Sequence, residues 1–142
     1  MKTLDQWLSE YSESHQNKTN KAYHQICVPL IFWSVVAFLT LIPLGPISAI
    51  LPVSLLAMTF YFRLGLKPGA LMSLLILAMI SVSDLIQHMT GHLLEIAVVV
   101  FVLAWIGQFI GHNIEGKKPS FFQDLQFLLI GPLWIFGPKF FK

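Results

Sequence analysis

The residues of this chain best suited to chemistry are five histidines: His15, His24, His88, His92 and His112. His15 and His24 come just before the first long apolar run, and His112 comes at the end of the fourth. Three neutral imidazoles can bind a divalent transition metal and leave coordination positions open for a substrate. If the fold brings these three together, they form a metal site that is also the catalytic site.

Two polar residues near His112 strengthen this interpretation. Gln108 lies four residues before His112, one helical turn away, and Glu115 lies three residues after it. Either side chain is a candidate ligand, or a candidate acceptor for a ring N–H that would orient a histidine on the metal.

The other two histidines, His88 and His92, are four residues apart, a spacing that would place both on one face of a helix. Asp84 and Glu95 extend this polar stripe. A hydrated helix end is the favoured interpretation, and a second group of metal ligands is the alternative.

The apolar runs of the sequence predict the elements that must position these residues. Charged residues make up 11% of the 142 residues, against roughly 25% in a soluble domain. The runs lack the alternation of β-strands and therefore predict membrane helices. Turn signals rich in glycine and proline separate most of them. The four expected spans are Ile26–Ile42, Ile47–Phe62, Gly69–Gln87 and Leu94–Gly111.

Weaker elements flank the four spans. The polar segment 1–25 opens with a capping-box pattern from Thr3 to Gln6 and carries an apolar stripe, which predicts an amphipathic helix on the membrane surface. The run Leu125–Phe136 is broken by a Gly-Pro pair, which favours a re-entrant or interfacial helix within 112–142. We therefore expect an all-α, polytopic helical bundle forming one integral-membrane domain over 1–142, with its spans in 26–111.

The orientation follows from the basic residues. Lysine and arginine occur before the first span, between the second and third, and after the fourth, and are absent from the other two connections. The positive-inside rule then predicts that both termini are cytoplasmic. His15, His24 and His112 would share that interface, with His88 and His92 on the opposite side. A net charge of +2 gives no indication of nucleic-acid binding, and the single cysteine excludes an internal disulfide framework.

Two sequence motifs resemble those of a known family. The segment 11–24, YSESHQNKTNKAYH, is followed by Val-Pro, and the segment 105–119 reads WIGQFIGHNIEGKKP. They resemble the motifs of the small membrane-bound 2-hydroxy fatty acid dioxygenases, and the similarity covers nearly the whole chain. His15, His24 and His112 match the motif histidines, and Asn20 is a further motif residue that could support them. His88 and His92 fall outside both motifs.

The resemblance implies an iron(II) dioxygenase that uses O2 to convert a 2-hydroxy fatty acid into a fatty acid one carbon shorter. Its partners would be that substrate, O2 and membrane lipid, in a bacterial inner membrane or a eukaryotic endoplasmic reticulum. The oligomeric state is open. Two alternatives remain: a zinc-dependent lipid hydrolase, since three histidines also suit zinc, and a non-catalytic small membrane protein for transport or assembly.

Overall fold

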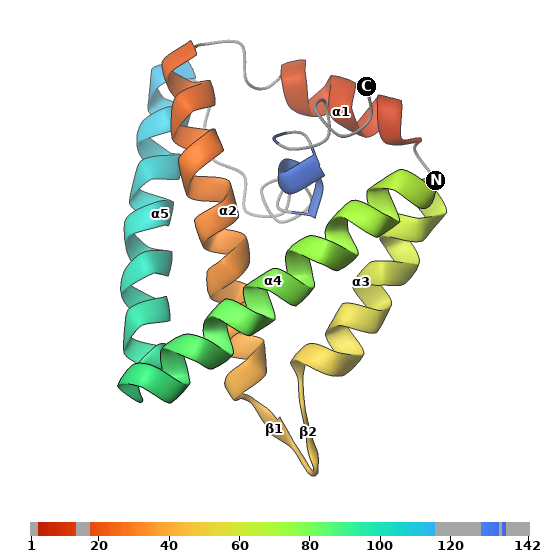
Figure 1. Ribbon diagram of the computed structural model, residues 1–142. Coiled ribbons are helices and arrows are strands. Elements are labelled where there is room, and N and C mark those ends of the chain that lie inside the picture. The colour runs from red at the N-terminus through yellow and green to blue at the C-terminus, as the bar shows by residue number, and fades with distance from the viewer. Residues whose placement is uncertain (1–2, 14–17, 116–128, 134, 136–142) are drawn as a thin grey trace.

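The structure is a computed structural model that describes residues 3–13, 18–115, 129–133 and 135, and helices dominate it (Figure 1). This confirms the predicted helical class. In chain order the elements are α1 (Leu4–Glu13), α2 (Lys18–Leu41), β1 (Pro43–Leu44), β2 (Ile47–Ser48), α3 (Ile50–Leu64), α4 (Leu66–Thr90) and α5 (Leu93–Glu115).

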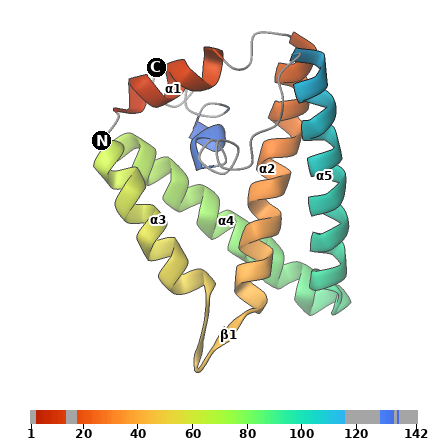
Figure 2. The same ribbon diagram turned by 180° about the vertical axis from the view of Figure 1, so that it is seen from behind.

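Two helix pairs build the bundle. Helices α2 and α5 run antiparallel and side by side along most of their length (Figures 1 and 2). Helices α3 and α4 form a second antiparallel pair, and α4 crosses α2 diagonally. The main apolar core lies where the pairs meet. Its fully or largely buried members are Phe32, Val36, Ile50, Tyr61, Met72, Ile76, Ile130 and Leu133.

Two helices of the described chain are long and apolar enough to cross a membrane, α4 over its whole length and α5 over Leu93–Gly111. The structure does not confirm the expected four spans. Helix α3 has 15 residues, or about 22 Å at 1.5 Å per residue, which is less than the roughly 30 Å of bilayer hydrocarbon. Helix α2 has 24 residues, but its apolar part is only Gln25–Leu41.

The connections explain why α3 is short. Where a turn was expected, the chain forms a small antiparallel hairpin in which Pro43 pairs with Ser48 and Leu44 with Ile47. Gly45 supplies the positive φ of 66° that its turn requires. At the other end of α3 a single residue, Gly65, separates it from α4, so α4 begins three residues earlier than expected.

Helix α1 has the predicted capping box. The Thr3 backbone N–H donates to Gln6 Oε1 at 2.9 Å, and the Gln6 N–H donates to Thr3 Oγ1 at 3.3 Å. Its apolar face does not lie only on the membrane surface, because Leu4, Trp7 and Leu8 pack against the main core. The Trp7 ring contacts Phe60 of α3 edge-on, with centroids 6.4 Å apart. Helix α1 therefore covers one end of the bundle (Figures 1 and 2).

The described part of the C-terminal segment is a helical turn enclosed by protein. Ile130 and Leu133 are fully buried in the main core, and Pro132 between them is also buried. The rest of the expected helix over Leu125–Phe136 lies outside the described residues.

Candidate functional site

One close contact marks the register between α2 and α5. Gly107 of α5 lies against Cys27 of α2, and a Cβ added at Gly107 would overlap the Cys27 sulfur. Tyr23, one turn before Cys27, lies beside the same glycine, with its ring 3.7 Å from that added Cβ. A side chain at position 107 would overlap the Cys27 sulfur, so either that sulfur or the two helices would have to shift.

This register brings the backbone positions of two predicted ligands to the same end of the helix pair. His24 precedes Cys27 by three residues, and His112 follows Gly107 by five. In an antiparallel pair both steps run toward the same end, by about 4.5 Å and 7.5 Å along the axis, so the two positions differ by about 3 Å in level. The side chains of His24, His112, Asn20 and Glu115 lie outside what the structure describes, as does His15 entirely.

Gln108 is the predicted site residue whose side chain the structure does describe. It is only 6% exposed, on the face of α5 that also buries Ala97, Ala104 and Gly111. Its Oε1 atom is buried and has no hydrogen-bond partner within the described part of the chain. A buried carboxamide oxygen without a donor is unfavourable, and in native structures such an atom points to a missing ligand, ion or water.

A row of aromatic rings runs along α5 beside this position. The Trp105 ring contacts Phe101 edge-on, with centroids 6.2 Å apart, and stacks at a tilt on Phe109 at 5.7 Å. Phe101 also meets Phe38 of α2. The spacing of four residues places these rings on one side of the helix. Trp105 is also the first residue of the second sequence motif.

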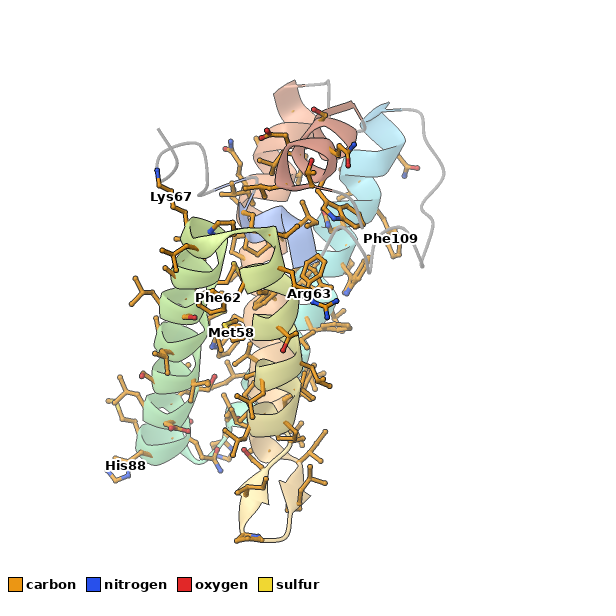
Figure 3. All side chains as sticks on the ribbon, turned by 90° about the vertical axis from the view of Figure 1, so that its right-hand side faces the viewer. Met58, Phe62, Arg63, Lys67, His88 and Phe109 are labelled. Atoms are coloured by element: carbon orange, nitrogen blue, oxygen red, sulfur yellow. The ribbon has the colours of Figure 1, made fainter. Side chains whose placement is uncertain are left out.

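The second histidine pair, His88 and His92, lies at the far end of the molecule. The prediction that the two share one helix face is wrong. Gly91, in the left-handed conformation at φ 70°, ends α4 after His88 and leaves His92 outside both helices. His88 is exposed at the end opposite Lys67 (Figure 3). His92 contacts Glu95 at 3.6 Å in the open. His92 comes directly before α5 and 20 residues before His112, a separation of about 30 Å along the helix.

The donor set fits a transition metal by its chemistry. Two imidazole-bearing positions share one level of the α2–α5 pair, beside a buried amide oxygen. Histidine nitrogen with few carboxylates is a ligand environment that suits iron and zinc. Among the described residues, no group of three His, Cys, Asp or Glu side chains could hold a metal. His15 and the side chains of His24 and His112 lie outside that description.

Comparison with known proteins identifies the family. A family model described as "2-hydroxy-palmitic acid dioxygenase Mpo1-like" matches residues 1–138. The chain belongs to the Mpo1-like family. It is 31% identical over 138 residues to a protein of Saccharomyces cerevisiae named 2-hydroxy-palmitic acid dioxygenase MPO1, covering 95% of this chain and 78% of that one. No solved structure matches the chain.

Membership of the Mpo1-like family confirms the resemblance seen in the two histidine motifs. At the level of the family it supports a dioxygenase of lipid metabolism and, with the two apolar helices, agrees with a membrane protein. The matched region contains His15, His24 and His112 together.

Proposed function

We propose that this protein is an iron(II)-dependent dioxygenase that converts a 2-hydroxy fatty acid and O2 into a fatty acid one carbon shorter. The observation that supports the proposal is the register of α2 and α5, which brings the backbone positions of His24 and His112 to within about 3 Å in level. The chain that carries them belongs to the Mpo1-like family. The name of the yeast relative supplies the substrate class.

In this proposal His15, His24 and His112 hold the iron through ring nitrogens, and Asn20, Gln108 and Glu115 surround the three rings. Bound iron(II) would supply open positions at which the substrate oxygens and O2 meet. The residues of the chain bring the reactants together, so that proximity lowers the barrier. Apolar helix surfaces near this end suit the alkyl chain of a substrate drawn from the bilayer, with its head group at the interface.

The overall reaction balances without an added reductant. The substrate R–CH(OH)–COOH reacts with one O2 to give R–COOH, CO2 and H2O. The bond between the carboxyl carbon and the hydroxyl-bearing carbon breaks, four electrons leave the organic substrate, and O2 accepts all four. The absence of a nicotinamide or flavin fingerprint from the sequence is compatible with this stoichiometry.

The test is oxygen uptake by the detergent-purified protein, loaded anaerobically with iron(II) and given 2-hydroxypalmitate. We expect one fatty acid shortened by one carbon for each O2 consumed, and no uptake after zinc replaces iron. Turnover without O2, or equal turnover with zinc, would support the hydrolase alternative and contradict the proposal.

Single substitutions then test the ligands. His24→Ala and His112→Ala should each lower bound iron and abolish uptake. The matched control is His88→Ala, because His88 is an exposed histidine near the C-terminal end of α4, opposite Lys67 and outside the proposed ligand set (Figure 3). It should retain iron and full activity. If His24→Ala or His112→Ala kept both iron and turnover, the ligand assignment would be wrong.

A further inference from the structure

The carboxamide oxygen of Gln108 is a buried acceptor without a donor in the described part of the chain. The residue is 6% exposed, so water does not reach it freely. Removing a carbonyl oxygen from water without replacing its hydrogen bond is costly, which is why most such atoms in native proteins are paired. Whatever group faces Oε1 in the working protein must be able to donate a hydrogen.

The position of Gln108 limits what that donor is. It follows Gly107 directly, at the close contact of α5 with Cys27 of α2, and precedes His112 by one turn. Positions 108 and 112 are one turn apart on the same side of α5. A ligand held near the backbone positions 24 and 112 would therefore lie within about one helical turn of Gln108.

The described side chains around this position are mainly apolar. The Trp105 Nε1–H is a buried donor that also has no hydrogen-bond partner in the described part of the chain, so it does not pair with Gln108 Oε1. Cys27, Ile31 and Ala104 form a small buried cluster here, with Phe101 and Trp105 packed against it. No described side chain of that cluster places a donor on Oε1. In such surroundings one correctly placed acceptor discriminates strongly between ligands that carry a donor and ligands that lack it.

We propose that Gln108 determines specificity by accepting a hydrogen bond from the 2-hydroxyl group of the substrate. This inference rests on the proposed function. A 2-hydroxy fatty acid differs from the far more abundant unsubstituted fatty acids by that single hydroxyl, which remains a donor when its oxygen is bound to a metal. An amide oxygen accepts from it, and an unsubstituted chain would leave Oε1 unpaired, so the site favours the hydroxylated acid.

The test measures binding without turnover, by anaerobic titration of the iron(II)-loaded protein. Three ligands are compared: 2-hydroxypalmitate, 2-methoxypalmitate and palmitate. The methoxy acid retains an oxygen at carbon 2 but has no proton to donate. The protein variant is Gln108→Met, which has a similar length and no strong acceptor. The methyl group of the methoxy acid has its steric effect in both the unsubstituted protein and Gln108→Met. That effect cancels when the hydroxy-to-methoxy affinity ratios of the two proteins are compared.

For the unsubstituted protein we expect the hydroxy acid to bind about tenfold more tightly than the methoxy acid. In Gln108→Met this difference should disappear, while the affinity for palmitate stays the same or rises. Gln25→Met is the matched control, since Gln25 is exposed on α2, and it should keep the tenfold preference. A preference that survives in Gln108→Met would overturn the inference.

Two further measurements separate this role from others. Iron affinity should be unchanged in Gln108→Met, and a fall would mean that Gln108 orients a metal ligand, which overturns the inference. If Gln108→Met does not fold, Gln108→Asn retains the acceptor on a shorter arm and should show a reduced preference; an undiminished preference would contradict the inference. Failure of the unsubstituted protein to consume O2 with 2-hydroxypalmitate would instead refute the proposed function.

Discussion

The hydroxyl of Tyr61 donates a 2.8 Å hydrogen bond to the backbone carbonyl of Leu129, which joins α3 to a turn 68 residues later in the chain. Tyr61 is fully buried, and the turn beyond Leu129 places Ile130 and Leu133 in the same core. A polar bond inside an apolar core is directional, so it fixes where the C-terminal segment enters the bundle, whereas apolar contacts alone fix mainly that it is buried.

Replacing this tyrosine tests the bond. Tyr61→Phe keeps the ring and its contact with Phe60, and removes only the donor. We expect a loss of about 1 kcal/mol in unfolding free energy, or roughly 4 °C in melting temperature. Thr59→Val is the control, because the exposed Thr59 hydroxyl bonds only within its own helix, and its loss should matter little. Equal melting temperatures for Tyr61→Phe and the unsubstituted protein would show that the bond contributes nothing.

The contact between Gly107 and Cys27 predicts a paired effect. Gly107→Ala would place a methyl group on the Cys27 sulfur and should destabilise the protein by about 1–3 kcal/mol, and weaken iron binding by separating α5 from α2. Adding Cys27→Ala removes the sulfur and should restore much of the lost stability and of the lost iron binding. Thermal unfolding of the two single variants and the double variant gives the coupling energy, and simple additivity would contradict the contact.

Helix α4 is predicted to cross the bilayer. Lys67 and His88 are exposed near its two ends (Figure 3) and 21 residues apart, or about 32 Å along the helix. In a Cys27→Ala background, which has no other cysteine, Lys67→Cys and His88→Cys should react with a membrane-impermeant maleimide from opposite sides of sealed vesicles. Labelling of both from one side would show that α4 does not span.

Helix α1 is expected to depend on a single aromatic side chain. Trp7→Ala removes the contact with Phe60 and a large part of the face that packs on the core. We predict a lower melting temperature and faster proteolysis within the first 13 residues, because α1 loses its main attachment to the bundle. Ser9→Ala changes an exposed position of the same helix and should have neither effect. Unchanged proteolysis of Trp7→Ala would mean that other contacts hold α1.

Local signals in the sequence predicted much of the fold. The capping box at Thr3 was predicted correctly, and the start of α5 was predicted to within one residue, because capping and apolar runs act over a few residues. The helix continues to Glu115, four residues past the predicted end at Gly111. The single-residue break at Gly65 was not predicted in that form. A proline three residues later suggested a longer turn, but proline is tolerated in the first turn of a helix.

The candidate site was only partly predictable for the same reason. Motif spacing indicated His24 and His112, yet nothing local says that Gly107 meets Cys27, which is a long-range packing fact. The error at His88 and His92 has a local cause instead. Their spacing suits a helix face, but Gly91 between them is a common helix terminator that adopts the left-handed conformation there.

The pairing of α2 with α5 has a consequence for biosynthesis. Some 50 residues separate the end of α2 from the start of α5, so a ribosome working at roughly 5–20 residues per second needs seconds more to deliver the partner helix. Until then a nascent chain carries two of the proposed iron ligands and lacks His112. On the proposed ligand set, the reactive centre cannot assemble before α5 has been synthesised through His112, so translation itself delays its assembly.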